Sequence, residues 1–466
     1  MSYYLAIDIG ASSGRFILSH IINNKIQSEE IYRFENKIMV LDGHLFWDID
    51  SLKDNVLKGL KICNEVGKIP SYVGIDSFGV DYVLLDQKKK IVDKVFSYRD
   101  SRTLNPMKEF HHVIPEEIYF KDTGIQPQSY NTLYQLLSDK ESKRLVKAKH
   151  ILMLPSYLNY FLTGVMANEK TILSTSGLLN GTSVKLNEDV LKILELSSNQ
   201  FPKIVEPGTK LGKVKRSIAD RIGYTPVIVA VCQHDTASAV MGSFADEATL
   251  FLSSGTWSLL GTITHRKFLD NSAYKFGFTN ELGFNNDVRF LKNIMGLWIA
   301  QKVKEENHPE LPYDTITQMA RDNSDYDEII DVNDSIFLSP KSMTQSIYDY
   351  LKLHQMKKPK SIGEIYYLIY NSLAKEYAKS IYDLECITGY QYEFINILGG
   401  GSKNKLLNEL TEKYTRKKVI SGPEEATAIG NVIVQMIADN TLQLNGGNKK
   451  LIIRNTINQF NLGEKS

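Results

Sequence analysis

The chain alternates between apolar runs of strand length and longer segments in which apolar residues recur at helical spacing. Strand-like runs fall at 3–9, 15–22, 26–34, 72–76, 226–231 and 394–398. Helical spacing is found at 47–66, 237–241, 296–304, 362–387, 404–414 and 427–438. Three meandering strands followed by a helix, and then by further strands and helices, predict an α/β protein with mixed sheets and helical layers.

Three local features of this pattern give specific predictions. Ser51 is expected to cap the helix at 47–66, because hydroxyl side chains accept hydrogen bonds from the free amides of a first helical turn. A hairpin is expected from 82–86 and 91–98 around a turn at 87–90. Beyond Asn440 the tail offers one further strand, at 451–453.

One arrangement occurs twice, first as Leu5-Ala-Ile-Asp-Ile-Gly-Ala-Ser-Ser-Gly-Arg-Phe-Ile-Leu18 and again, more loosely, as Leu250-Phe-Leu-Ser-Ser-Gly-Thr-Trp-Ser-Leu-Leu-Gly-Thr262. Each copy is an apolar run, a turn of glycine and small hydroxyl residues, and a second apolar run. This pattern is typical of a β-hairpin whose small turn lets a ligand approach the backbone. Two copies predict a duplicated fold that binds one polyphosphate between domains at 1–242 and 243–466, with the boundary within 242–247.

Composition narrows the classes of function. A chain of 466 residues is too long for a single hydrophobic core, so more than one domain is expected. Its 55 Lys and Arg residues nearly balance its 54 Asp and Glu residues, so net charge gives no general attraction to nucleic acid or to an anionic membrane. The three cysteines lack metal-ligand spacing and fit a reducing compartment. No signal-like segment opens the chain, and no apolar run approaches the ~20 residues that span a bilayer. We expect a cytoplasmic protein with no nucleic-acid or membrane partner.

The first glycine turn carries candidate phosphate chemistry. Asp8 ends an apolar strand, where a carboxylate is costly unless a cation or hydrogen-bond donors compensate it. A water-mediated contact to Mg²⁺ beside ATP phosphates would compensate it, because Mg²⁺ prefers oxygen ligands and keeps several waters. Ser12, Ser13, Gly14 and Arg15 offer hydroxyls, amides and a guanidinium to phosphate oxygens. The alternatives are a turn aspartate that accepts from local amides and an arginine exposed on a surface hairpin.

Asp235 is the strongest candidate for catalysis. It lies at a strand-to-helix junction, where open α/β sheets place their ligand crevice. Phosphoryl transfer to a hydroxyl needs a carboxylate that orients the nucleophile and accepts its proton. The alternative is that Asp235 only caps the following helix. From the residues alone, a histidine such as its neighbour His234 is more often structural than catalytic.

The run Gly399-Gly400-Gly401 joins a strand to a helix. Three glycines are entropically costly unless something lies flat against the backbone, such as an adenine or a ribose. The run lacks the Gly-Lys-Ser/Thr of a Walker A motif and the spaced glycines of the dinucleotide fingerprint. P-loop and Rossmann folds are therefore poor matches.

Seven segments together resemble the FGGY carbohydrate kinases of the actin/hexokinase ATPase superfamily, from the first strand to about Ile437. They are Ile7-Asp-Ile-Gly-Ala-Ser-Ser-Gly-Arg15, Gly79-Val-Asp-Tyr-Val-Leu-Leu-Asp86, Tyr98-Arg-Asp-Ser-Arg102, Asn131-Thr-Leu-Tyr-Gln135, His234-Asp-Thr-Ala-Ser-Ala239, Leu252-Ser-Ser-Gly-Thr-Trp-Ser-Leu259 and Leu291-Lys-Asn-Ile-Met-Gly-Leu-Trp298. The resemblance implies two actin-like (ribonuclease H-like) domains around a cleft. It also implies ATP- and Mg²⁺-dependent phosphorylation of a ketose. The expected phosphate acceptor is the 1-hydroxyl of L-rhamnulose, in rhamnose breakdown.

The resemblance also assigns roles to individual residues. Nucleotide contacts are implied for Ala11, Ser12, Ser13, Gly14, Arg15, Thr256, Gln301 and Gly400. Sugar contacts are implied for Gly79, His234, Asp235, Thr236 and Asn293, with Asp235 as the proton acceptor. The first domain is expected to hold mainly the sugar and the second mainly ATP, in a monomer or small homo-oligomer.

Two departures from the family pattern leave the acceptor open. Gln233 stands where Ser is expected, and Ser77-Phe78 stands where Thr-Trp is expected, both beside the implied sugar pocket. Another ketose, such as L-fuculose or L-ribulose, is therefore an alternative. From a different class, the alternative is an actin- or chaperone-like ATPase that lacks a sugar acceptor.

Overall fold

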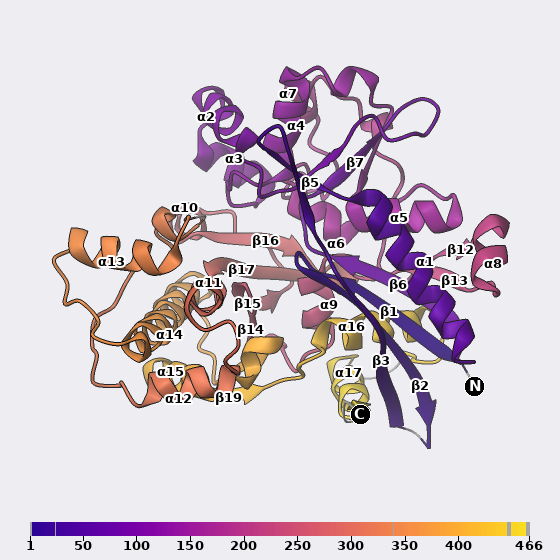
Figure 1. The fold of residues 1–466 in the computed structure, drawn as a ribbon. Coiled ribbons are helices and arrows are strands. Elements are labelled where there is room, and N and C mark those ends of the chain that lie inside the picture. The colour runs from indigo at the N-terminus through magenta and orange to yellow at the C-terminus, as the bar shows by residue number, and fades with distance from the viewer. Residues whose placement is uncertain (1, 24, 339, 445–448, 463–466) are drawn as a thin grey trace.

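Two mixed β-sheets flanked by helices form the body of the molecule (Figure 1). The computed structural model describes residues 2–23, 25–338, 340–444 and 449–462. Both sheets combine parallel and antiparallel strands, as the sequence predicts, and the α/β class is confirmed. Within the described residues, no helix is long and apolar enough to cross a membrane.

The first sheet has seven strands. Its order is β12 (Thr209–Lys213), β13 (Val227–Ala230), β6 (Pro70–Ser77), β1 (Tyr3–Ile9), β2 (Ser13–Ile22), β3 (Lys25–Glu35) and β20 (Phe460–Leu462). β1, β2 and β3 form an antiparallel meander, while β1, β6 and β13 run parallel. The apolar runs predicted at 3–9, 15–22, 26–34, 72–76 and 226–231 all lie in this sheet, because its centre is covered on both faces.

The second sheet repeats the same arrangement. Its order is β16 (Phe278–Leu282), β17 (Val288–Met295), β15 (Trp257–Thr264), β14 (Thr249–Ser254), β18 (Phe394–Leu398) and β19 (Lys418–Ser421). β14, β15 and β17 are antiparallel, and β14, β18 and β19 are parallel. β14–β15 therefore corresponds to β1–β2, and the duplicated hairpin expected from the sequence is confirmed as a repeat of backbone structure.

One long helix packs on each sheet. In α1 (Ile49–Glu65), Leu52, Val56 and Leu60 are buried at the spacing of a single face. In α14 (Ile362–Thr388), the buried face is wider because the helix lies inside the second core. The prediction that Ser51 caps α1 is wrong. Asp48 is the N-cap, and its carboxylate accepts from the Ser51 amide at 2.9 Å, so Ser51 contributes the donor.

Two short helices that correspond in the repeat cross each other between the sheets. α9 (Asp235–Met241) follows β13, and α16 (Ala426–Ala438) follows β19. A Cβ on Gly430 would lie 1.8 Å from the Ser238 carbonyl oxygen, and one on Gly242 would lie 2.0 Å from that of Ala426. The two backbones can meet so closely only because both positions are glycine.

The C-terminal part of the chain returns to the first sheet. α16 packs against β1 and β6 with Ala428, Val432 and Met436, and β20 pairs in parallel with β3. The predicted strand at 451–453 is wrong, because this segment lies in α17 (Lys449–Ile457) and the final strand is β20. The division at 242/243 stays a prediction, and the segment after residue 425 contacts both halves.

The remaining helices and strands belong to one or other of the two halves. In the first they are β4 (Ile38–Leu41), β5 (His44–Trp47), β7 (Tyr82–Leu85), β8 (Val95–Phe96), α2 (Leu104–Val113), α3 (Glu116–Thr123), α4 (Thr132–Glu141), β9 (His150–Met153), α5 (Leu154–Thr163), β10 (Asn168–Glu169), α6 (Lys170–Leu173), α7 (Glu188–Leu194), β11 (Ile204–Val205) and α8 (Arg216–Ile222). In the second they are α10 (Asn271–Lys275), α11 (Trp298–Asn307), α12 (Tyr313–Arg321), α13 (Met343–Leu353) and α15 (Lys405–Thr415).

The predicted hairpin at 82–98 forms only in part. The turn at 87–90 is present, and Leu85 bridges Ile91. Beyond that point the strands separate: β7 pairs with β9, and β8 pairs with β5. The expectation is wrong for the second strand, because tertiary partners far along the chain replace the local pairing.

Candidate active site

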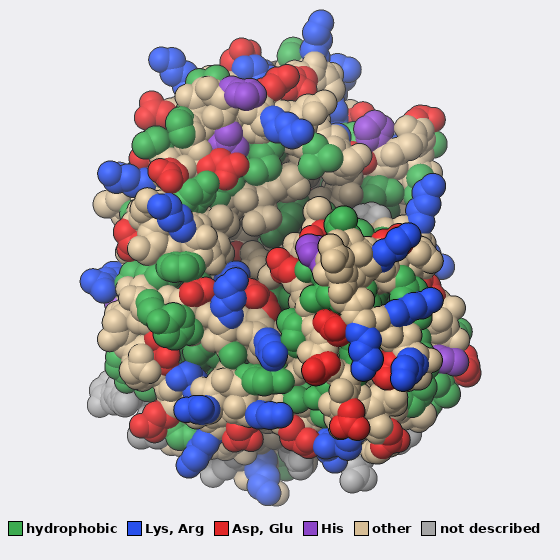
Figure 2. All heavy atoms as spheres, turned by 90° about the vertical axis from the view of Figure 1, so that its left-hand side faces the viewer, with side chains coloured by type: hydrophobic (Ala, Val, Ile, Leu, Met, Phe, Trp, Pro, Cys, Tyr) green, Lys and Arg blue, Asp and Glu red, His purple; other side chains and the backbone are tan. Residues whose placement is uncertain are grey.

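A cavity of about 770 Å³ lies between the two halves and contains nearly all the residues singled out from the sequence. Its lining includes Asp8, Ala11, Ser12, Ser13, Arg15, Gly79, His234, Asp235, Thr236, Thr256, Asn293, Gln301 and Gly400. Viewed from the side on which α13 lies in Figure 1, the surface is hollowed at mid-height, and both signs of charge are interspersed (Figure 2).

Gly14 is the predicted site residue that does not line this cavity. A Cβ at this position would lie 2.1 Å from the Phe34 ring, so the glycine makes room for a core aromatic on the neighbouring strand. The absent side chain therefore has a packing reason. The role of Gly14 in nucleotide contact stays a prediction.

The first hairpin places a network of charged side chains beside the cavity. Its turn is closed by the Gly10 amide, which donates to the Ser13 carbonyl at 2.9 Å. Arg15 then lies 2.6 Å from the Asp8 carboxylate and 2.5 Å from that of Glu425, the residue before α16. Burial raises the pKa of Glu425, although Arg15 opposes this effect. The arginine thus links β1 to the far end of the chain.

The second hairpin presents neutral groups. The Gly255 amide donates to the Trp257 carbonyl at 3.0 Å, and the Thr256 hydroxyl donates to the Gln301 side chain at 3.2 Å. Thr256 is also fixed through its carbonyl, which accepts from the Gly296 amide. A phosphate here would meet hydroxyls and amides rather than fixed charges.

The triple glycine has three different local explanations. Gly399 has a φ of 76°, which favours glycine. A Cβ on Gly401 would lie 2.1 Å from the Ser254 hydroxyl, so this residue allows the second hairpin to approach. Around Gly400 a Cβ would meet no described atom within 4 Å, and this residue lines the cavity. Gly400 therefore leaves its backbone open to the cavity, which Gly399 also lines.

Asp235 is the first residue of α9, and its carboxylate faces the cavity. It accepts from the Thr236 amide at 2.5 Å and the Thr236 hydroxyl at 3.1 Å, and its side chain remains 30% exposed. Burial in the cleft raises its pKa, with a further contribution from the Asp8 carboxylate. The N-cap of α9 is His234, which makes no side-chain cap. The local contact to Thr236 leaves Asp235 accessible for a substrate proton.

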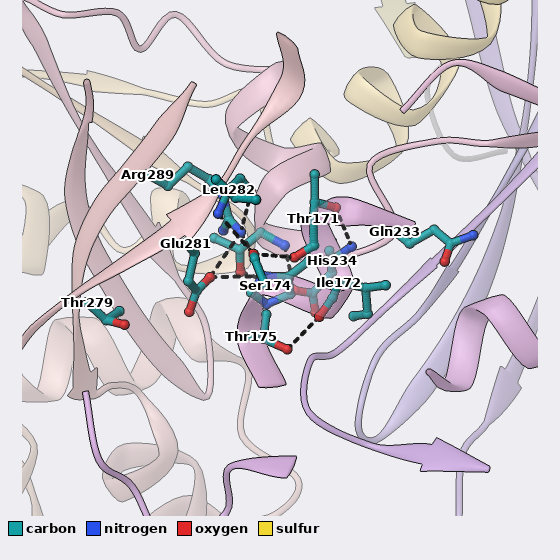
Figure 3. A network of polar contacts seen from close by, with 12 residues as sticks. Thr171, Ile172, Ser174, Thr175, Gln233, His234, Thr279, Glu281, Leu282 and Arg289 are labelled. Carbon is teal, nitrogen blue, oxygen red and sulfur yellow. Dashed lines mark hydrogen bonds and ion pairs between the residues drawn. The ribbon is translucent and has the colours of Figure 1, made fainter. Parts of the chain in front are cut away.

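Behind Asp235, His234 is held by two charged residues of the second half (Figure 3). Its Nδ1 lies 3.1 Å from Glu281 and 3.0 Å from the Arg289 guanidinium, and Arg289 lies 3.0 Å from Glu281. Burial alone would raise the pKa of Glu281, but Arg289 and His234 outweigh it and lower that pKa. Glu281 also lines the cavity, so one buried ion pair orients His234 beside the cavity.

A second buried carboxylate fixes the backbone that carries these residues. Glu169 accepts from the Thr171 amide at 2.7 Å, the Thr171 hydroxyl at 2.6 Å and the Gln233 amide at 3.0 Å. The Thr171 hydroxyl in turn accepts from the His234 amide at 3.3 Å. Burial raises the pKa of Glu169 to about 7. The hydrogen bonds from Thr171 and Gln233 oppose this rise in pKa, because they favour the ionised carboxylate.

The same buried segment also positions the Gly79 loop. The Thr175 hydroxyl accepts from the Val80 amide at 3.0 Å, and a Cβ on Gly79 would lie 3.1 Å from this hydroxyl. Val80 adopts a φ of 67°, a costly conformation for a β-branched residue. Thr175 and Gly79 both line the cavity, so the strained loop borders it.

The departures from the family pattern have different positions. Gln233 accepts from the Ser156 hydroxyl at 2.6 Å and, like Ser77, is not among the residues that line the cavity. Phe78 does line it, and its ring lies against Trp47. Of these three residues, Phe78 is therefore the one whose side chain could contact a molecule bound in the cavity.

Sequence reasoning missed several lining residues. They include Tyr98, Arg99, Gln128, Tyr130, Asn131, Thr279 and Glu281. Tyr98, Arg99 and Asn131 lie in segments that carry the family resemblance, so that resemblance was the available signal. For Thr279 and Glu281, the strand in which they lie offered no local signal.

Comparison with known proteins places this chain in a family. Residues 3–242 match the FGGY family of carbohydrate kinases, N-terminal domain, and residues 250–438 match the C-terminal domain of the same family. The chain therefore belongs to the FGGY family of carbohydrate kinases, and the family expected from the resemblance of the seven segments is confirmed.

Curated relatives extend over almost the whole chain. A rhamnulokinase of Oceanobacillus iheyensis is 40% identical over 436 residues, which is 93% of this chain and 93% of the relative. Rhamnulokinases of Lactiplantibacillus plantarum and Bacillus subtilis are 38% and 39% identical, over 97% and 93% of this chain and 93% and 90% of the relatives.

Solved structures share the fold. Xylulose kinase from Lactobacillus acidophilus superposes with a TM-score of 0.80 at 14% identity, over 97% of this chain and 92% of that chain. Plasmodium falciparum glycerol kinase with ADP gives 0.78 at 15% identity, over 98% of this chain and 92% of that chain. The two-domain actin-like fold is thereby confirmed.

Proposed function

We propose that this protein phosphorylates L-rhamnulose at its 1-hydroxyl with ATP, forming L-rhamnulose 1-phosphate in L-rhamnose catabolism. The observation that carries the proposal is the position of Asp235, in a cavity that both glycine-turn hairpins line. The curated relatives, each named rhamnulokinase, support the choice of ketose. We further infer a cytoplasmic monomer or small homo-oligomer.

The donor side would bind ATP through both hairpins. Ala11 to Arg15 offer amides, hydroxyls and a guanidinium to the phosphates, while Thr256, Gln301 and Gly400 offer neutral contacts. Arg15 is held by two carboxylates, so it can neutralise phosphate charge without losing its position. Most catalysis of phosphoryl transfer comes from such positioning and charge stabilisation.

The residues present fit Mg²⁺ as a partner of the nucleotide rather than as an ion in an all-protein cage. Within the described ranges, no cluster of three His, Cys, Asp or Glu side chains has metal-binding geometry. Mg²⁺ is often held by one carboxylate, several waters and substrate phosphates. Asp8, beside the turn, would hold the ion through water. Once bound, Mg²⁺ would neutralise charge that develops on the β- and γ-phosphate oxygens.

On the acceptor side, Asp235 would act as the general base. The 1-hydroxyl oxygen would form a bond to the γ-phosphorus, the bond from that phosphorus to ADP would break, and Asp235 would accept the hydroxyl proton. Its raised pKa makes the carboxylate a better proton acceptor than an exposed aspartate. His234, Gly79, Thr236 and Asn293 would hold the sugar, and closure of the halves would exclude water.

Two alternatives are separated by activity measurements. A kinase for L-fuculose or L-ribulose would share this chemistry, and an actin- or chaperone-like ATPase would turn over ATP without sugar. The oriented His234 and the Phe78 ring at the acceptor side favour a sugar kinase, because an ATPase has no use for an acceptor pocket.

The test is ADP release measured with L-rhamnulose, L-fuculose and L-ribulose and without sugar. We expect L-rhamnulose to give the highest kcat/KM and sugar-free turnover to be negligible. Asp235→Asn should bind ATP normally and lose about 10²–10⁴-fold in rate, the scale of a positioned acid–base group. Equal rates with all three ketoses would reject the named substrate, and near-normal turnover of Asp235→Asn would reject the base.

A further inference from the structure

A second cavity, of about 460 Å³, lies behind the acceptor side and shares no lining residue with the first. It is bounded by α9, by Ile263 of β15, by the β16–β17 connection and by α17. This volume is within the range of small-molecule sites, which occur preferentially between domains. Nothing in the proposed reaction uses it.

One wall of the second cavity is apolar and belongs to the catalytic helix. Ala237, Val240 and Met241 lie on α9, which begins with Asp235, and Ile263 and Phe284 continue the wall. A molecule seated here would contact the helix whose first residue is the proposed base. Such a molecule needs an apolar body to match this wall.

Arg289 is a buried charged residue that lines the second cavity. This side chain is 1% exposed, and its Nε and Nη2 donate to the Leu282 carbonyl at 3.2 and 3.1 Å. Nη2 also lies against His234 and Glu281, as Figure 3 shows. Nη1 is buried and has no hydrogen-bond partner among the described residues. A buried guanidinium donor is costly to leave unsatisfied, so a ligand oxygen here would be stabilised.

The other charges at this cavity are already paired. His265 lies 2.6 Å from Glu247 and 3.1 Å from Asp287, and Arg454 lies 2.8 Å from Asp246. Arg289 Nη1 and Arg454 Nε are buried guanidinium nitrogens at this cavity that have no hydrogen-bond partner among the described residues. Of these two residues, Arg289 is the one that also contacts His234. The guanidinium would touch the ligand on one side and His234 on the other.

We propose that the second cavity binds a small organic anion with an apolar body, and that its occupancy is transmitted to the acceptor pocket through Arg289. Binding itself does not depend on the proposed function. The transmission rests on that function, because it is read as a change in sugar phosphorylation.

Binding is tested with 8-anilinonaphthalene-1-sulfonate, whose fluorescence rises on burial in an apolar site. We expect saturable binding to the full-length protein that excess ADP and Mg²⁺ do not displace. N-phenyl-1-naphthylamine, which has the same rings without the sulfonate, should bind about tenfold more weakly because it leaves Nη1 unsatisfied. Displacement by ADP would overturn the second site, and equal affinity of the neutral probe would overturn the anion requirement.

A pair of variants locates the probe. Ala245→Phe fills the cavity and should weaken sulfonate binding at least about tenfold, whereas Ala248→Phe, on an exposed residue that does not line the cavity, should leave it unchanged. Both variants should keep the wild-type thermal midpoint and ADP affinity. Undiminished binding to Ala245→Phe would overturn the assignment of the cavity.

Transmission is read from kinetics with the sulfonate present. The KM for the ketose should change at least about twofold while the KM for ATP stays constant, and Ala245→Phe should abolish the change. Confirmed binding with an unchanged ketose KM would overturn transmission through Arg289. An enzyme that phosphorylates no ketose would instead reject the proposed function, while the fluorescence result would still decide the site.

Discussion

On the side of the cleft that we propose binds ATP, the donor side, two hairpins with the same strand arrangement present their turn residues to the cavity. On the side that we propose binds the sugar, the acceptor side, His234 and Asp235 lie at a strand end held by buried charges from distant segments. The donor side relies on Arg15, which is 24% exposed between two carboxylates. The acceptor side relies on Glu169 and the Glu281–Arg289 pair, all of which are buried. Both sides therefore depend on charged contacts between segments far apart in the chain, and those of the acceptor side are the more deeply buried.

Between the hairpins themselves, the duplicated backbone carries different chemistry. The first has the charges of Asp8 and Arg15, and the second has the hydroxyl of Thr256 and open amides. A repeated fold can therefore divide phosphate binding between a charged half and a neutral half. The predictions below test this division and the contrast with the acceptor side, from the largest expected effect to the smallest.

Asp8→Asn should have the largest effect on the donor side. It removes one of the two carboxylates that hold Arg15 and the proposed contact to Mg²⁺, so kcat should fall by about 10²-fold and more Mg²⁺ should be required. ADP release over a Mg²⁺ titration measures both. Asp54→Asn, on the exposed face of α1, is the matched control. An Asp8→Asn enzyme within about twofold of wild type at every Mg²⁺ concentration would contradict the charged role of the first hairpin.

Glu169→Gln should show that the acceptor side depends on a buried anion. The amide places a donor against a group of donors, which shifts Gln233 to Asp235, so kcat should fall by about 10- to 100-fold with little change in the KM for ATP. Glu206→Gln, on an exposed carboxylate nearby, is the control. A change confined to the KM for ATP would contradict the separation of the two sides.

The pH dependence of activity and of stability, compared between the wild type and Glu169→Gln, tests the role of Glu169 independently. The pKa of Glu169 is raised from 4.5 to about 7, so the ionised network assembles, and activity rises, as pH increases through about 7. Stability should move the opposite way, because a raised folded-state pKa favours folding at low pH. Relative to Glu169→Gln, the wild-type free energy of unfolding should fall as pH rises from about 4.5 to about 7. Parallel slopes of activity and stability would refute this assignment.

On both sides, the sequence predicts the contiguous segments and misses the contacts between distant ones, for a physical reason. Each hairpin is a short contiguous pattern, and so is the strand, turn and helix around Asp235. The Arg15–Glu425 pair spans 410 positions, and the Arg289–His234 contact spans 55. Glu169 precedes a four-residue helix with no distinctive spacing. Which distant charges meet depends on how the two sheets pack, and a single sequence offers no local signal for that.

The turn glycines sharpen the comparison between the hairpins. Gly14→Ala should lower stability by about 1–3 kcal/mol, because its Cβ would overlap the Phe34 ring. Gly255→Ala should change it by less than about 0.5 kcal/mol, because the nearest contact, the Trp257 carbonyl, is 3.7 Å away. Urea unfolding midpoints measure both. Equal shifts would mean that Gly14 has no packing role.

The neutral contacts of the second hairpin should give the smallest effect. Thr256→Val keeps the shape of the side chain and removes the hydroxyl that donates to Gln301, so the KM for ATP should rise by about 2- to 10-fold, the range of one hydrogen bond. Thr256→Ser keeps the hydroxyl and should stay near wild type. The KM for the ketose should be the same in all three proteins, because Thr256 lies on the donor side. A change in the ketose KM that exceeds the change in the ATP KM would place Thr256 with the acceptor and break the division between the two sides.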